Sequence, residues 1–215
     1  MNRDLTDYRK SYDKKALEEK EVPKSPFQLF SDWFKEVEKE GGVEETNAMT
    51  LTTFGLDGFP KARIVLLKQF DNDGFVFFTN YESEKGKAIS YNNKVCISFF
   101  WPNLERQVII KGEVNKLSEE KSTAYFQSRP RGSQLGAWAS NQSNIVDSRE
   151  VLEEKLSYLE KKFDNKEIPK PDFWGGFCVT PIEFEFWQGR PNRLHDRIRY
   201  STAIDDEWKI DRLAP

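Results

Sequence analysis

The only histidine of the chain, His195, lies in its densest cluster of chemically useful side chains. An aromatic run (184–188, Phe-Glu-Phe-Trp-Gln) leads into a turn-forming segment (189–192, Gly-Arg-Pro-Asn), and Arg193 and Arg197 stand on either side of the histidine. Because side chains alternate between faces on an extended segment, Arg193, His195 and Arg197 are predicted to share one face. Such groups beside a tryptophan would bind an anion and an aromatic ring. The simpler interpretation is a surface turn with solvated charges.

Three further segments carry groups that bind anions. Arg63 and Lys68 stand at the two ends of an apolar β run, so a straight strand would point them to opposite faces and to different anions. Ser83 and Lys85 lie where a strand passes into a helix, whose free N–H groups attract phosphate and to which both side chains could add contacts. Residues 125–133 provide a tyrosine, two arginines and a serine, a donor set suited to a phosphate monoester. The simpler interpretations are solvated strand ends and ordinary helix caps.

Several familiar chemistries are not expected. Cys96 and Cys178 lie far apart without Cys-x-x-Cys spacing, so no metal site is predicted, and both are predicted to be buried thiols in a reducing compartment. Residues 71–74 (Asp-Asn-Asp-Gly) resemble the start of a calcium loop but lack its closing glutamate. The sequence has no Walker loop and no Gly-x-Ser-x-Gly. The donor sets therefore suit a phosphorylated ring compound and a flavin, with the cofactor performing the chemistry.

Length and composition limit the class of protein. The chain has 215 residues with 17 Phe, 7 Tyr and 6 Trp, so large rings are expected to build the core of a single domain. The net charge is −3, so no overall basic field favours a nucleic-acid partner. No apolar stretch approaches the ~20 residues that span a bilayer. The polar N-terminus does not resemble a secretory signal, so we expect a cytoplasmic protein with no membrane partner.

Periodicity and turn residues predict the elements that position these groups. Residues 1–24 are highly charged without an apolar period and are predicted to form a flexible arm or substrate lid, followed by one domain over 25–215. A capping box at Ser25 predicts a helix that ends at Gly41. Further helices are predicted over 83–91, 118–128 and 147–163, and strands over 49–54, 61–68, 75–79, 95–101, 107–117, 176–180, 182–187, 197–202 and 208–211. Short strands without regular βαβ alternation predict an α+β fold, an antiparallel Greek-key-type barrel decorated by helices, rather than a Rossmann domain.

The order of motifs along the chain resembles that of the pyridoxine (pyridoxamine) 5′-phosphate oxidase family. Residues 184–188, followed after four residues by 193–197 (Arg-Leu-His-Asp-Arg), are similar to that family's C-terminal signature. The other segments that fit the family in order are 63–68, 105–107, 128–131, 141–143, 173–176 and 208–213. The resemblance covers nearly the whole chain, from about Tyr8 to Pro215.

This resemblance implies an FMN-binding split β-barrel that forms a homodimer with FMN at the interface. It implies an enzyme of vitamin B6 metabolism that oxidises pyridoxine or pyridoxamine 5′-phosphate to pyridoxal 5′-phosphate with O2 as acceptor, producing H2O2, and ammonia from the amine. The implied flavin contacts are Arg63, Ile64, Val65, Leu66, Lys68, Phe78, Thr79, Lys85, Gln107, Gln142, Ser143, Trp187 and Arg197. The implied substrate contacts are Lys68, Tyr125, Arg129 and Ser133 on the phosphate, the catalytic pair Arg193 and His195 orienting the ring, and Arg9 and Tyr12 on the segment that closes over it.

Two positions depart from the family pattern. Glu84 stands where a phosphate-binding arginine is expected, and Arg190 where a glycine is common. Glu84 is expected to weaken FMN binding unless it turns outward at the start of its helix. Two alternatives stay open: a non-catalytic protein that binds flavin or pyridoxal phosphate, which the Glu84 departure favours, and another flavin oxidoreductase on the same fold. The predicted substrate-phosphate donors argue against the second.

Overall fold

The computed structural model describes residues 3–202 and 207–215 of a chain that divides into two compact units. Unit 1 consists of Met1–Thr50, Ile97–Lys111 and Pro181–Pro215, and unit 2 of Leu51–Cys96 and Gly112–Thr180. The strands that contribute residues to both units are β1 (Ala48–Phe54), β5 (Lys94–Trp101), β6 (Arg106–Lys116) and β7 (Trp174–Gln188). The expectation of one domain over residues 25–215 stays a prediction.

Within the described residues, the strands form one sheet in the order β2-β1-β5-β6-β7-β4-β3, with β8 pairing with β7 and with β9. The pairings of β3 with β4, β4 with β7, β7 with β8 and β8 with β9 are antiparallel. The remaining strands are β2 (Pro60–Leu66), β3 (Gln69–Asp71), β4 (Gly74–Asn80), β8 (Asp196–Thr202) and β9 (Trp208–Arg212). The predicted mainly β, largely antiparallel architecture is therefore confirmed, although the strands predicted at 176–180 and 182–187 are one continuous strand, β7.

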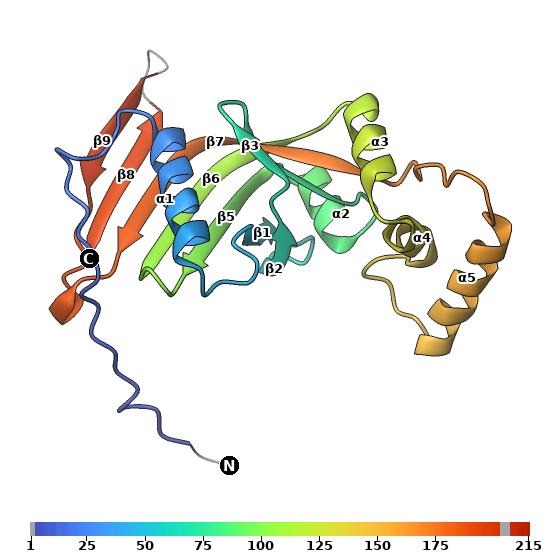
Figure 1. Ribbon diagram of the computed structural model, residues 1–215, viewed down its shortest axis with the longest axis horizontal. Coiled ribbons are helices and arrows are strands. Elements are labelled where there is room, and N and C mark those ends of the chain that lie inside the picture. The colour runs from blue at the N-terminus through green and yellow to red at the C-terminus, as the bar shows by residue number, and fades with distance from the viewer. Residues whose placement is uncertain (1–2, 203–206) are drawn as a thin grey trace. The chain divides into compact units, whose positions relative to one another are not determined.

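Unit 2 contains four helices among its described residues, of which α2, α3 and α4 line the pocket described below. They are α2 (Glu84–Tyr91), α3 (Glu119–Ser128), α4 (Arg131–Ala139) and α5 (Arg149–Lys162), and Figure 1 shows α4 beside α5. Helix α4 was not predicted, because its N-cap Pro130 makes no side-chain cap bond and its sequence contains two glycines. Burial of apolar side chains stabilises it instead. Helix α4 contributes to a hydrophobic core cluster whose buried residues are Phe126, Leu135, Ala139, Leu159, Phe163, Ile168 and Trp174.

In unit 1, helix α1 (Pro26–Glu40) packs on β7 and β9 through aromatic edges. The Ser25 hydroxyl accepts a hydrogen bond from the backbone N–H of Gln28, as the predicted capping box requires. The ring of Phe27 lies 5.2 Å from Phe184 and 6.3 Å from Trp208, and the helix ends at Gly41 in the left-handed region (φ 71°). Both predicted ends of this helix are confirmed.

The N-terminal segment, residues 3–24, contains no helix or strand, but several contacts hold it. Leu17 is buried, and its backbone N–H donates to Asp196 Oδ2 at 3.0 Å. Arg212 donates to the Leu17 carbonyl at 3.0 Å and forms an ion pair with Glu19. The Tyr200 hydroxyl donates to the carbonyl of Pro23 at 2.8 Å. These contacts attach residues 17–23 to β8 and β9; that the segment acts as a flexible arm or a lid stays a prediction.

Candidate functional site

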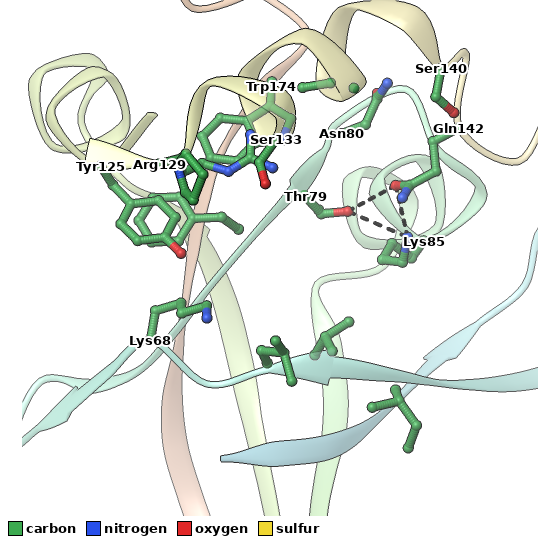
Figure 2. A pocket seen from close by; sticks show the side chains of 17 residues that line it. Lys68, Thr79, Asn80, Lys85, Tyr125, Arg129, Ser133, Ser140, Gln142 and Trp174 are labelled. Carbon is green, nitrogen blue, oxygen red and sulfur yellow. Dashed lines mark hydrogen bonds between the residues drawn. The ribbon is translucent and has the colours of Figure 1, made fainter. Parts of the chain in front are cut away.

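A pocket of about 610 Å³ lies wholly within unit 2, and β2, β4, α2, α3 and α4 contribute to its wall. Figure 2 shows one group of polar side chains at Lys85 and another around Lys68 and Arg129. The predicted site residues that line the pocket are Ile64, Val65, Leu66, Lys68, Phe78, Thr79, Lys85, Tyr125, Arg129, Ser133 and Gln142. The structure therefore brings together most of the predicted phosphate and flavin contacts from segments far apart in the sequence.

Lys85 is the centre of the first polar group. Its side chain is buried, and its ammonium donates to Gln142 Oε1 at 3.0 Å and to Thr79 Oγ1 at 3.3 Å, as Figure 2 shows. Burial lowers the pKa of Lys85, and the positive charge of Arg63 lowers it further. Arg63 itself donates to Thr53 Oγ1 at 2.7 Å, and burial lowers its pKa too. Two cations without a carboxylate ion-pair partner among the described residues repel each other and would be stabilised by an anion.

At the start of α2, the structure shows what the Ser83 and Glu84 side chains contact. The Ser83 hydroxyl is buried, donates to the Asn80 carbonyl at 2.6 Å and accepts from Gly86 N–H at 3.3 Å. The predicted phosphate contact from the Ser83 side chain is therefore wrong, because this hydroxyl caps the helix. Glu84 forms an ion pair with Lys61, and their side chains are 45% and 55% exposed. Its carboxylate therefore has a cationic partner of its own.

Arg129 is the centre of the second polar group. Its guanidinium lies 4.7 Å from the centre of the Trp174 ring, and Nη1 is buried without a hydrogen-bond partner among the described residues. Burial lowers the pKa of Arg129. Trp174 stacks on Phe78 at 5.5 Å, and Phe78 stacks on Tyr125 at 3.8 Å, so an aromatic wall fixes this end of the pocket. A buried N–H without an acceptor is costly, and an anion entering the pocket would satisfy it.

Lys68 and Ser133 complete this end of the pocket (Figure 2). Lys68 follows β2, and its ammonium makes no ion pair among the described residues, while Ser133 lies in the first turn of α4. Two cations, a serine hydroxyl and a tyrosine hydroxyl form a donor set suited to a phosphate. The pocket thus has two separate cationic ends, each suited to an anion. Residues Ile64–Leu66 of β2 form an apolar edge of the same pocket.

The His195 group lies in unit 1, in a second pocket of about 760 Å³. The ring of His195 is 4.6 Å from that of Trp187 and 5.8 Å from that of Tyr12. The backbone N–H of Arg190 donates to His195 Nδ1 at 3.0 Å, so the neutral ring carries its proton on Nε2. Burial lowers the pKa of His195, and the positive charge of Arg193 lowers it further. The histidine is therefore held as a neutral hydrogen-bond donor.

Of the three residues predicted to share one face, Arg193 and His195 line this pocket, whereas Arg197 does not. Arg193 ends the 3-10 turn η1 (Pro191–Arg193), and its φ of 59° lies in the left-handed region, so side chains do not alternate there. Arg197 lies on β8 opposite Trp187 and donates to Glu185 Oε1 at 2.8 Å. This ion pair, which raises the pKa of Arg197, was not predicted because the pairing of β7 with β8 brings the two together.

The remaining predicted contacts lie outside these two pockets. Ser143 has a φ of 73° and lines a third pocket, in unit 2, with Asn144 and Ile145. Gln107 lies half-buried on β6 in unit 1, so the predicted flavin contacts are divided between the units. Sequence reasoning gave no role to Trp174 as a pocket wall, although its Phe-Trp-Gly-Gly segment was among those that fit the family.

The described residues also bear on metal binding, on the two cysteines and on membrane insertion. Within residues 3–202 and 207–215, no three His, Cys, Asp or Glu side chains gather where they could hold a metal ion. Cys96 and Cys178 are free, but each is only half-buried rather than buried as predicted. Burial raises the pKa of Cys178, which keeps it a protonated thiol near neutral pH. None of the described helices is both long and apolar enough to span a membrane.

Comparison with known proteins gives consistent results. Residues 33–162 match a family profile described as pyridoxamine 5′-phosphate oxidase, and residues 174–215 match one described as the pyridoxine 5′-phosphate oxidase C-terminal dimerisation region. The chain is 61% identical to a pyridoxine/pyridoxamine 5′-phosphate oxidase of Flavobacterium psychrophilum, over 99% of this chain and 100% of that one.

Two solved structures share the fold. One is PhzG from Burkholderia lata in complex with tetrahydrophenazine-1-carboxylic acid, with a TM-score of 0.87 and 27% identity, over 96% of this chain and 100% of that one. The other is an FMN-binding, pyridoxamine 5′-phosphate oxidase-related protein of Nostoc punctiforme, with a TM-score of 0.70 and 15% identity, over 90% of this chain and 100% of that one. The predicted split β-barrel fold is thereby confirmed.

Proposed function

This chain belongs to the pyridoxine/pyridoxamine 5′-phosphate oxidase family, and from that premise we propose that it oxidises pyridoxine 5′-phosphate or pyridoxamine 5′-phosphate to pyridoxal 5′-phosphate. FMN, when bound, would accept the two electrons that leave the substrate and pass them to O2, giving H2O2; with the amine substrate, water would supply the aldehyde oxygen as ammonia is released. We further propose a cytoplasmic location, which the two free thiols favour.

The observation that carries the proposal is the buried, unpartnered Nη1 of Arg129 at one end of a pocket whose other end holds Lys85. FMN and the substrate each carry one phosphate, so two separate cationic ends fit this pair of ligands. We assign the Arg129 end, with Lys68, Tyr125 and Ser133, to the substrate phosphate. A tetrahydrophenazine carboxylic acid, the ligand in the PhzG structure, has no phosphate to satisfy these donors.

The Lys85 end fits the FMN phosphate. Burial lowers the pKa values of Lys85 and Arg63, and the charge of Arg63 lowers that of Lys85 further; a phosphate would compensate both charges. The Gln142 oxygen and the Thr79 hydroxyl already orient the Lys85 ammonium. Ile64, Val65 and Leu66 would provide an apolar edge for the flavin ring.

Residues of unit 1 would orient the substrate ring. Because His195 Nδ1 accepts from a backbone N–H, its Nε2–H is the group left to donate to a ring oxygen or nitrogen. Arg193, with no ion pair among the described residues, would add a positive charge beside it. Neither residue needs to carry a proton in the reaction; both would hold the ring in place.

The match of residues 174–215 to a dimerisation region supports a homodimer, and we propose that flavin contacts come from both chains. On this proposal, Trp187, Arg197 and His195 of one copy complete the unit 2 pocket of the other. Sedimentation of the FMN-loaded protein at low micromolar concentration should give a dimer. A loaded monomer would contradict the arrangement.

Anaerobic mixing of the purified, flavin-loaded protein with pyridoxine 5′-phosphate tests the function directly. Bleaching of the flavin absorbance, and its return on admitting air with formation of H2O2, is the expected result. Binding without bleaching would indicate a non-catalytic flavin or pyridoxal-phosphate protein. Bleaching by tetrahydrophenazine-1-carboxylic acid but not by the phosphate ester would indicate a different oxidoreductase on the same fold.

A further inference from the structure

Glu105 is a buried carboxylate for which the proposed reaction has no use. It lies in the turn between β5 and β6, its residue is 2% exposed, and its φ of 56° is in the left-handed region. A residue with a Cβ rarely adopts this conformation, which is usually left to glycine or asparagine. Strain of this kind persists where surrounding contacts require it and is frequent at functional sites.

The carboxylate of Glu105 binds the N-terminal segment. Its Oε2 accepts hydrogen bonds from the backbone N–H groups of Asp13 at 3.0 Å and Lys14 at 3.2 Å. Its Oε1 lies 3.4 Å from the ammonium of Lys10, whose side chain is 62% exposed. Because the Lys10 side chain is largely exposed, whereas the N–H contacts are partly buried, the two bonds to Oε2 account for most of the attachment.

The backbone of Glu105 binds the other side of the same site. Its carbonyl accepts from the N–H of Gly189 at 2.8 Å and from Gln188 Nε2 at 3.3 Å. A Cβ on Gly189 would lie 2.8 Å from Tyr12 Cβ and 3.0 Å from Glu105 Cβ, so only glycine lets these three segments meet. One residue thus joins the N-terminal segment to the end of β7.

This attachment fixes the position of the Tyr12 side chain. It is next to Asp13, whose N–H Glu105 binds, and its ring lies 5.7 Å from Trp187 and 5.8 Å from His195. The ammonium of Lys10 lies 5.7 Å from the centre of the Tyr12 ring. Losing the bonds to Asp13 and Lys14 would allow residues 8–13 to leave the His195 pocket. Lys14 and Lys15 would keep their side-chain contacts with the Asn103 carbonyl and with Glu36, and residues 17–23 would remain attached through Asp196, Arg212 and Tyr200.

We propose that Glu105 is a positioning residue, which acts through its two backbone hydrogen bonds to hold Tyr12 and Arg9 over the His195 pocket. Its consequence for substrate affinity rests on the proposed function, whereas its consequence for the N-terminal segment does not. The left-handed backbone of Glu105 is the geometry that aims the carboxylate at Asp13 and Lys14 while its carbonyl meets Gly189.

Glu105→Gly and Glu105→Gln test this role in the full-length, FMN-loaded protein. Glycine accepts the left-handed backbone and removes the carboxylate, so the turn should survive while the two N–H groups lose their acceptor. Glutamine keeps one oxygen, which is enough because both N–H groups bind Oε2. Glu105→Asn, which also tolerates this backbone but is one methylene shorter, serves as a second variant if Glu105→Gly unfolds.

The first readout is limited trypsin digestion, since Arg9, Lys10, Lys14 and Lys15 are cleavage sites in the attached segment. Cleavage there should be about tenfold faster in Glu105→Gly than in the parent, and near parental in Glu105→Gln, because it follows how often the segment opens. The second readout is steady-state kinetics, where Glu105→Gly should raise KM for pyridoxine 5′-phosphate about tenfold with a smaller change in kcat and unchanged FMN content.

The two readouts separate the possible failures. Equal tryptic cleavage of Glu105→Gly and the parent would overturn the positioning role, whatever the kinetics show. Faster cleavage in Glu105→Gln to the same degree as in Glu105→Gly would also overturn it, since a single oxygen should suffice. Faster cleavage only in Glu105→Gly supports the role even if no substrate is oxidised, and that second result would count against the proposed function alone.

Discussion

Replacing Arg129 by methionine should separate substrate affinity from stability. Methionine keeps an unbranched apolar stem against Trp174 but removes the charge and every N–H donor. Because Nη1 of Arg129 is buried without a partner and burial lowers the pKa of the group, the guanidinium is not well satisfied in the absence of an anion. We expect Arg129→Met to bind pyridoxine 5′-phosphate more weakly without losing folding stability.

The magnitude follows from the contacts. A charge-assisted hydrogen bond to a phosphate contributes about 1.5–3 kcal/mol, so its loss should raise KM roughly 10- to 150-fold. For folding, removing a buried N–H without an acceptor gains about 1–3 kcal/mol. Losing the cation–π contact with Trp174, at 4.7 Å, costs about 0.5–2 kcal/mol. These terms nearly cancel, so the unfolding free energy should change by less than about 1 kcal/mol.

Arg131 provides a matched control two residues further along the chain. Its guanidinium donates to the carbonyls of Phe163 and Lys166 and does not line the pocket. Arg131→Met should therefore lower the unfolding free energy by about 1–3 kcal/mol and leave KM unchanged. Urea unfolding and initial-rate assays on both variants measure the two quantities.

A crossed result would refute the reasoning about Arg129. If Arg129→Met lost several kcal/mol of stability while its KM stayed parental, the guanidinium would be a structural group and the pocket end would not bind a phosphate. If flavin were lost instead and substrate affinity kept, the assignment of the two phosphates to the two ends would be reversed.

Three further predictions concern the cofactor and the histidine. Flavin released from the purified, yellow protein on denaturation should be FMN, because the Lys85 and Arg63 end suits one terminal phosphate; chromatography decides, and FAD as the main species would contradict the assignment. Glu84→Arg should tighten FMN binding about fivefold at low salt and less at high salt, because the Glu84 side chain is half-exposed and forms an ion pair with Lys61. Equal affinities of the parent and the variant in titrations of the apo-protein would show that position 84 does not face the phosphate. The sole histidine should titrate below its ordinary pKa of 6.5 by NMR. The stability that depends on its neutral form is therefore present above pH 6.5 and is lost as the pH falls through the lowered pKa of the folded protein; a midpoint above 6.5 would be inconsistent with the burial of His195 and its contact with Arg193.

Local signals were sufficient for elements whose ends are marked by short-range chemistry. The Ser25 hydroxyl caps α1 as the capping box predicts, and Gly41 ends it. The break predicted within β7 was wrong for a reason visible only in the pairing. Proline lacks an N–H and should interrupt a strand, but Pro181 lies between Val179, the last residue paired with β4, and Glu183, the first paired with β8. The sequence does not show at which residue β7 stops pairing with β4 and begins pairing with β8.

For the candidate site, residue types could be predicted more readily than side-chain partners. Lys85 and Ser83 stand two positions apart at the start of α2, yet one lines the pocket and the other caps the helix. Their different roles depend on where α2 meets β4 and the segment carrying Gln142, which are contacts between residues distant in sequence. Pro102 and Asn103 mark that turn, but nothing local indicates that Glu105 rather than Asn103 has the left-handed backbone.

Ion pairing separates the cations that can attract a ligand from those that hold the fold. Arg197 is bound to Glu185, Arg199 to Asp211 and Arg212 to Glu19 and Asp196, so each adds little net charge to its surroundings. Lys68, Lys85 and Arg129 have no carboxylate partner within the described part of the chain, although acidic residues outnumber basic ones by 36 to 33. In a chain with a net charge of −3, these cations without ion-pair partners leave one pocket locally positive. The affinity for two phosphates should therefore rest on the unpaired cations of unit 2, and the predicted flavin contact Arg197 should act mainly by its position beside Trp187.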